Sequence, residues 1–147
     1  MHASVILRND REIVLNAVKQ NSHSLSYASN QLKNDKIIVS VAVQNHSYTF
    51  QFASDNLRND REFVLQLLEN HNFNLRDVRY LWEYAGYEIQ RDKDIVFRIL
   101  GKDPRILADL DPEFQNDKEI VLLAVMHDGF AIRYASENLQ NDREVVL

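Results

Sequence analysis

The chain has 147 residues, of which 45% are apolar and 10% aromatic, so it is long enough to bury a hydrophobic core. Seventeen Lys and Arg residues against 22 Asp and Glu residues leave a net charge of −5 without a basic run, which argues against nucleic acid as a partner. The sequence has no cysteine and no apolar stretch of membrane-spanning length, so we expect a soluble, cytoplasmic chain without disulfides, thiolate metal sites or membrane contact.

One phrase recurs along the chain at a spacing of 25 residues. It begins as LRNDREIVL at Leu7 and returns, with small changes, near positions 32, 57, 89, 114 and 139. The step from Leu57 to Ile89 is longer than the others by seven residues, so the third unit contains an insertion. We therefore expect one helical repeat domain over residues 1–147, with units starting near 7, 32, 57, 89 and 114 and partial units at both ends.

The first half of each unit has the apolar spacing of an amphipathic helix. In the first unit Val14, Ala17 and Val18 stand at positions i, i+3 and i+4, and the other units keep this spacing. We expect the equivalent valines to be buried: Val14, Val39, Val64, Val96 and Val121. The Asn-Asp pair before each stripe predicts a helix start. Asp is the preferred N-cap, since Arg91 replaces Asn in unit four, but Asn remains possible in the other units.

The second half of each unit predicts a shorter helix that ends near an aromatic residue and Ala. The recurring sequences are LSYASNQ, FQFASDN, WEYAGYE and AIRYASEN, and we expect the aromatic residue to fill space beside Ala. In unit four, Gly101 is suited to end the first helix and Asp103-Pro104 to begin the second. Two helices per unit cannot bury both faces alone. They predict an all-α, right-handed-type array of stacked helical hairpins, similar to an α-solenoid.

The repeated motif resembles a known family. The pattern LxNDxExVLxAVxxN…YASxxL, present at Leu7–Leu32 and Phe114–Leu139, is similar to the bacterial and protist repeats catalogued as domain of unknown function 4116. The resemblance implies an all-helical repeat module with no established activity and no catalytic residues to carry over. Such repeats occur in larger proteins, including secreted effectors of intracellular bacteria such as Legionella, which would place the chain in a host cell. Units three and four depart from the motif, with Gly86 in place of Ser and with LADLDPE.

Histidine and aspartate are the candidates for a metal or catalytic site. Histidines occur at positions 2, 23, 46, 71 and 127, and His46 and His71 hold the same turn position in successive units. A metal or proton-transfer ladder is one interpretation. We favour polar turn residues, because Asn21 holds this position in unit one and no HExxH-type motif is present. The regularly spaced Asp residues are interpreted as helix caps rather than as a cation-binding edge. We predict no enzyme activity and no cofactor.

The insertion in unit three is the predicted binding site. Alignment of the units puts the seven extra residues near Phe73–Arg79, where they lengthen the second helix by about two turns. Trp82 and Tyr84 fall on positions expected in the core, whereas Tyr87 falls on a polar, exposed position. Because Tyr and Arg are favoured at protein interfaces, we predict a protein-binding patch of these residues: Phe73, Arg76, Arg79 and Tyr87.

Two functions are consistent with these features. The first is a non-catalytic scaffold that binds an unidentified protein partner, because repeat stacks offer extended surfaces. The alternative is an accessory segment that positions substrate for a catalytic domain outside this sequence. Because residues 3–7 close a unit and residues 141–147 open one, we also expect weak head-to-tail self-association.

Overall fold

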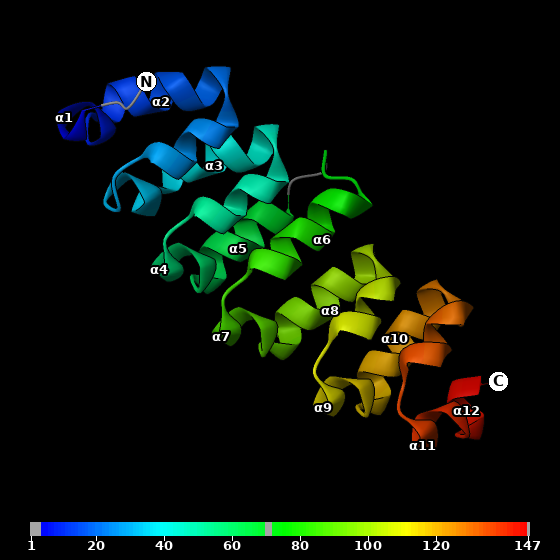
Figure 1. Ribbon diagram of the computed structural model, residues 1–147. Helices are drawn as coiled ribbons and strands as arrows, with labels where there is room; N and C mark the ends of the chain where they lie inside the picture. Colours follow the sequence, from blue (N-terminus) through cyan, green and yellow to red (C-terminus); the bar gives the residue numbers. More distant parts are fainter. Residues whose placement is uncertain (1–3, 70–71, 147) are drawn as a thin grey trace. The chain divides into compact units, whose positions relative to one another are not determined.

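The computed structural model describes residues 4–69 and 72–146, and within these ranges its regular secondary structure is entirely helical (Figure 1). The prediction of an all-α repeat fold is confirmed. The chain divides into two compact units, Met1–Ile89 and Gln90–Leu147, and the boundary falls where the fourth repeat begins. The prediction that residues 1–147 form a single domain stays a prediction.

The first compact unit contains three repeats in which a long helix, a second helix and one short helical turn follow each other. Its elements are α1 (Val5–Arg8), α2 (Arg11–Gln20), η1 (Ser22–Tyr27), η2 (Leu32–Asn34), α3 (Lys36–Asn45), η3 (Ser47–Phe52), α4 (Asp55–Arg58), α5 (Arg61–Leu68), α6 (Leu75–Tyr84) and α7 (Tyr87–Gln90). The last residue of α7 belongs to the second compact unit.

The second compact unit repeats the same order of elements. They are α8 (Lys93–Lys102), η4 (Pro104–Asp109), α9 (Pro112–Gln115), α10 (Lys118–His127), η5 (Gly129–Tyr134), α11 (Glu137–Gln140) and α12 (Arg143–Val146). In Figure 1 the short turns α9 and α11 lie at one edge of this unit, as α1 and α4 do in the first.

Each repeat contains the two predicted helices and, in addition, a short helical turn that the sequence did not predict. The residues before each Asn-Asp pair form this turn, and in α1 and α4 a Ser side chain caps it. For example, Ser54 Oγ accepts a hydrogen bond from the Leu57 N–H at 3.2 Å. The second helices η1, η3, η4 and η5 have only six residues each and are 3₁₀-helices, a form that occurs in short pieces.

The insertion lengthens the second helix of unit three by about one turn, rather than the two turns that the sequence predicts. With the extra residues α6 reaches ten residues and is an α-helix. Asn74 caps it by accepting hydrogen bonds from the N–H groups of Arg76 and Asp77, and the Asp77 side chain accepts one from the Asn74 N–H in return. This capping box fixes the start of α6 within the inserted residues.

Asp is the N-cap of five long helices: α2, α3, α5, α8 and α10. This confirms the preferred interpretation of the Asn-Asp pair. Asp10 accepts a hydrogen bond from the Ile13 N–H, and its counterparts Asp35, Asp60, Asp92 and Asp117 do the same in their own helices. Asn instead joins successive repeats: Ser29 Oγ donates to Asn9 Oδ1 at 2.7 Å, and Ser136 Oγ to Asn116 Oδ1 at 2.7 Å.

The core lies between the long and the second helices of neighbouring repeats. Val14, Val39, Val64, Val96 and Val121 are all buried, as predicted. In the first unit α3 packs against α2, η1 and η3, and in the second α10 packs against α8, η4 and η5. The opposite side of the second helices is not covered by these contacts, and we call it the open side.

Candidate interaction surface

The side chains of the regularly spaced Asp residues already have partners within the protein. In each compact unit the basic residue that follows one Asp pairs with the Asp of the next repeat: Arg11 Nε lies 2.7 Å from Asp35 Oδ2, Lys36 Nζ 2.6 Å from Asp60 Oδ2, Lys93 Nζ 2.7 Å from Asp117 Oδ2 and Lys118 Nζ 2.9 Å from Asp142 Oδ2. These carboxylates therefore cap one helix and hold the preceding repeat.

The pKa values of these carboxyls follow from the same contacts. The pKa of Asp60 is lowered because the Lys36 ammonium and the Phe63 N–H donate hydrogen bonds to it. Burial works to raise the pKa of Asp35, but hydrogen bonds from the Arg11 side chain and the Ile38 N–H outweigh it and lower the pKa. Asp117 behaves like Asp35, with Lys93 as its partner. Each of these groups is stabilised as the anion in the fold.

The histidines that the structure describes do not converge on a metal site. No group of three or more His, Cys, Asp or Glu side chains with metal-binding geometry occurs in the described residues. His46 Nδ1 lies 3.3 Å from the hydroxyl of Ser22, which is buried. His71 lies outside the described residues. His23 instead belongs to a cluster of aromatic rings.

Aromatic residues form two columns on the open side of the second helices in the first compact unit. One column consists of His23, Tyr48 and Tyr80, and the other consists of Tyr27, Phe52 and Tyr84, four positions later in each helix. We call these six residues the aromatic face. His23 and Tyr27 are exposed, and the other four residues are half-buried, so both members of each pair reach the surface.

The rings of the aromatic face contact each other from repeat to repeat. The ring centroids of His23 and Tyr48 are 6.5 Å apart, and those of Tyr48 and Tyr80 are 6.3 Å apart. Between the columns, His23 and Phe52 meet edge to face at 5.0 Å, and Tyr80 and Tyr84 stack at 6.1 Å. These distances are typical of favourable aromatic pairs, so the rings hold each other in one continuous row across η1, η3 and α6.

The structure corrects the expected position of the aromatic residue in the YAS motif. Trp82 is only 5% exposed, as predicted, but Tyr84 is half-buried rather than in the core, and Tyr27 is 63% exposed. The reason is that the residue two positions earlier (Leu25, Phe50 or Trp82) already fills the core. The aromatic residue next to Ala is turned toward solvent.

Four tyrosines contribute hydroxyl groups to this face. In the part of the chain that the structure describes, the hydroxyls of Tyr27, Tyr48, Tyr80 and Tyr84 neither donate nor accept a hydrogen bond. Burial and the neighbouring Glu83 raise the pKa of Tyr84 above its ordinary value, so its hydroxyl stays protonated at neutral pH. The Tyr84 hydroxyl is thus available as a donor.

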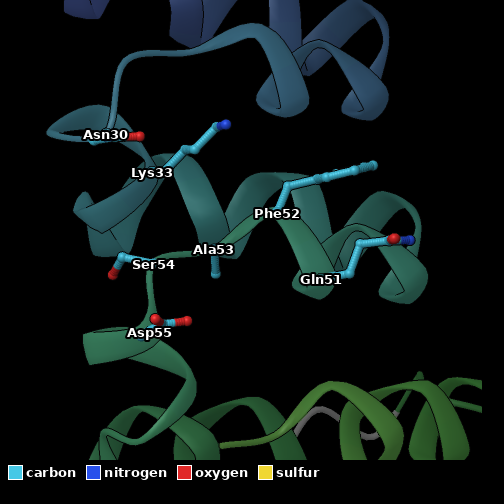
Figure 2. Close-up of a pocket in the computed structure, with 7 residues that line it drawn as sticks. All are labelled: Asn30, Lys33, Gln51, Phe52, Ala53, Ser54 and Asp55. Carbon is cyan, nitrogen blue, oxygen red and sulfur yellow. The ribbon is translucent and has the colours of Figure 1, made fainter.

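A shallow depression of about 420 Å³ adjoins the face at Phe52 (Figure 2). It is lined by Asn30, Lys33, Gln51, Phe52, Ala53, Ser54 and Asp55. Figure 2 shows Asn30 and Lys33 coming from the segment that ends in η2, and Gln51–Asp55 from the end of η3 and the start of α4. The depression is polar and open, and it extends the row of rings between two successive repeats.

The four residues predicted as the binding patch lie along α6 and are not gathered at one point. Phe73 precedes the helix and is half-buried, while Arg76 and Arg79 are exposed in its first half. Tyr87 is 65% exposed and begins α7, beyond the other end of α6. The ten-residue helix α6, about 15 Å long, lies between Phe73 and Tyr87 in the chain. Arg76 lies one turn before Tyr80 and thus borders the aromatic face.

In the second compact unit the same positions carry different chemistry. The fourth repeat has Arg105 and Asp109 in place of the two rings. The Arg105 side chain donates two hydrogen bonds to Asp103, which is fully buried, at 2.9 and 3.1 Å. The fifth repeat has Phe130, 75% exposed, and Tyr134, with the Arg133 guanidinium over both rings. A continuous row of rings is therefore a property of the first unit.

Sequence reasoning missed the first column of rings although the signal was present. His23, Tyr48 and Tyr80 stand four positions before Tyr27, Phe52 and Tyr84 in every one of the first three repeats. A spacing of four residues predicts a shared helix face. The predicted patch lies instead at the insertion, where the repeats differ, and not on the surface that the first three repeats share.

The fold and these contacts define an all-helical repeat protein. The family model described as "Domain of unknown function (DUF4116)" matches residues 1–33, 10–58, 35–81 and 117–147, in overlapping segments that follow the repeats. The chain belongs to this family. No curated protein and no solved structure matches the chain. None of the helices that the structure describes is long and apolar enough to cross a membrane.

Proposed function

We propose that the chain is a non-catalytic binding module whose aromatic face holds a segment of another protein. The observation that carries the proposal is the continuous row of partly exposed rings across three successive repeats. Aromatic side chains supply large, rigid contact area and are enriched at the centre of protein interfaces. Rings in these positions do not fill the core; they pack against each other and stay partly exposed to solvent.

The predicted patch extends this face. Arg76 and Arg79 lie on α6 next to Tyr80, and Arg is the other residue type enriched among interface hot spots. Phe73 and Tyr87 lie at the two ends of α6. We propose that the six rings form the centre of the interface and that these four residues contribute at its edge.

The test is selection of random linear peptides, displayed on phage, against the full chain. Selected peptides are then measured against Tyr48→Ala/Tyr80→Ala and against Arg76→Ala/Tyr87→Ala. We expect the first pair to weaken binding by ~3 kcal/mol and the second by ~1–2 kcal/mol, because central contacts cost more to remove than edge contacts. Peptides that bind the Tyr48→Ala/Tyr80→Ala variant as tightly as the parent would refute the proposal, provided that circular dichroism shows the variant to be folded.

A further inference from the structure

We propose that His23 makes binding to the aromatic face depend on pH, so that a bound segment is released when the imidazole takes up a proton. This inference rests on the proposed function and names a regulation of the same surface. Among the residue types of the face, only histidine changes its charge between about pH 5 and pH 8, since Phe does not titrate and the ordinary pKa of Tyr is about 10. His23 is therefore the one ring of the aromatic face that can switch from neutral to positive near neutral pH.

The position of His23 places it under any segment that lies across the first two repeats. Its side chain is exposed, and its ring lies 5.0 Å from that of Phe52 and 6.5 Å from that of Tyr48 on the neighbouring repeat. The ring of Tyr27, four positions later on η1, lies 6.1 Å away. Repeats two and three carry Tyr48 and Tyr80 at the position of His23, so the row of rings does not need a titratable group there. A ligand on η1 and η3 therefore removes His23 from water.

The surroundings of His23 offer no negative charge to a protonated imidazole. The helix η1 packs against α2, α3 and η3, and neither η1 nor η3 contains Asp, Glu, Lys or Arg. The last turn of α2, which leads into η1, carries Lys19, and the last turn of α3 carries no charged residue; the other charged residues of both helices are in their first turns.

The remaining titratable groups near His23 belong to other rings. They are Tyr27 on η1, Tyr48 on η3 and His46, which precedes η3 and whose ring lies 5.9 Å from that of Tyr48. The imidazole of His23 forms no hydrogen bond or ion pair with the residues that the structure describes. A proton on His23 therefore adds a charge that the fold does not pair.

The cost of covering a protonated His23 gives the direction of the effect. An imidazolium that is covered without a counter-charge loses its water, and this loss costs free energy. The contacts with the rings of Tyr27, Tyr48 and Phe52 exist with and without a ligand, so they do not offset this cost on binding. Binding therefore favours neutral His23 and releases a proton. The affinity is complete above the pH range in which histidine titrates and falls as the pH drops through it.

The experiment uses fluorescein-labelled peptides selected on phage against the full chain at about pH 7.5. The chosen peptides depend on Tyr48 and Tyr80 and contain no histidine, so their own charge stays nearly constant down to about pH 5.5. Fluorescence anisotropy measures their affinity at both pH values. We expect the parent chain to bind roughly fivefold to tenfold more weakly at about pH 5.5, where histidine in general is mostly protonated.

Three variants assign the effect to His23. His23→Tyr carries the residue that repeats two and three have at this position, so it should keep the affinity at about pH 7.5 within roughly threefold and lose the pH dependence. His46→Asn carries the residue of repeat one at its own position, and His127→Asn lies in the second compact unit. Both are controls that should keep the pH dependence of the parent. Circular dichroism at both pH values shows whether each variant is folded.

Equal affinity of the parent at the two pH values would overturn the inference, and so would a pH dependence that persists in His23→Tyr. Tighter binding in acid would also overturn it, because the ligand would then supply a carboxylate to the protonated imidazole. These outcomes leave the proposed function in place, since the peptides still depend on Tyr48 and Tyr80. If no selected peptide depends on these two residues, the proposed function fails and the inference fails with it.

Discussion

The second repeat and the fourth repeat have the same interior and opposite surfaces. In both, an Asp caps the long helix and a buried valine, Val39 or Val96, faces the core. On the open side of the second helix, repeat two presents Tyr48 and Phe52, whereas repeat four has Arg105 and Asp109 at those positions. The repeated phrase thus specifies packing, and the residues that the repeats do not share specify what the surface can bind.

The largest expected effect concerns the shared interior. Val64→Asp should unfold the first compact unit, because an unpaired buried charge costs several kcal/mol against a total stability of roughly 5–15 kcal/mol. Ile37→Asp is the control, since Ile37 is 59% exposed and should lose less than ~1 kcal/mol. Thermal melting followed by circular dichroism compares the two. A single transition in the parent would also agree with one cooperative domain, and an unchanged melting temperature for Val64→Asp would contradict the buried register.

The next effect concerns Asp103, the partner of Arg105, which stands at a ring position in repeat four. Asp103→Ala removes the cap of η4 and the partner of Arg105, so it should destabilise the chain by ~1–2 kcal/mol. Asp103→Asn keeps an oxygen that accepts from the Arg105 N–H and should cost less. Urea denaturation measures both. Equal losses for the two variants would mean that capping contributes little and that the ion pair dominates.

Acid should lower the stability of both compact units in the same way. The pKa values of Asp35, Asp60, Asp117 and Asp142 are lowered in the fold, so the unfolded chain binds more protons than the folded chain in acid. This stabilisation is complete above the ordinary Asp pKa and is lost as the pH falls through the lower folded values. Replacing Arg11 by Met should raise the pKa of Asp35 and leave that of Asp117 unchanged, as NMR titration of the two carboxyls would show. No change at Asp35 would refute the assigned ion pair.

The smallest effect concerns the link between repeats. A Cβ atom at Gly86 would lie 2.0 Å from Asn59 Oδ1, which accepts a hydrogen bond from the Glu88 N–H. Gly86→Ser should nevertheless cost less than ~1 kcal/mol, because Asn59 can turn and form the Asn-Ser bond that Asn116 and Ser136 form. Gly86→Val offers no hydroxyl and should cost more. A large loss for the Ser variant would show that the third repeat cannot adopt the link used by the others.

The interior was largely predictable because a 25-residue period marks equivalent positions. Val64, Trp82 and the Asp caps follow from local spacing and helix chemistry. The short turns and the 3₁₀ form of η1 and η3 could not be predicted from this period. The turns involve Ser caps, and a segment of six residues is short enough to form a 3₁₀-helix instead of an α-helix. The exposure of Tyr84 was missed because an aromatic residue beside Ala fits a core or a surface equally well from sequence alone. Contacts between repeats, such as Asn9 with Ser29, need the three-dimensional stack.

The central claim is that a partner lies on the aromatic face. The most direct measurement is NMR of the full chain with a phage-selected peptide, following the backbone amides and the ring signals of Tyr and Phe. The account predicts that the largest shifts fall on η1, η3 and α6, at Tyr48, Phe52 and Tyr80, while Phe130 and Tyr134 stay unchanged. Shifts confined to the Asp-capped helix starts or to the second compact unit, with the signals of Tyr48 and Tyr80 unmoved, would contradict it.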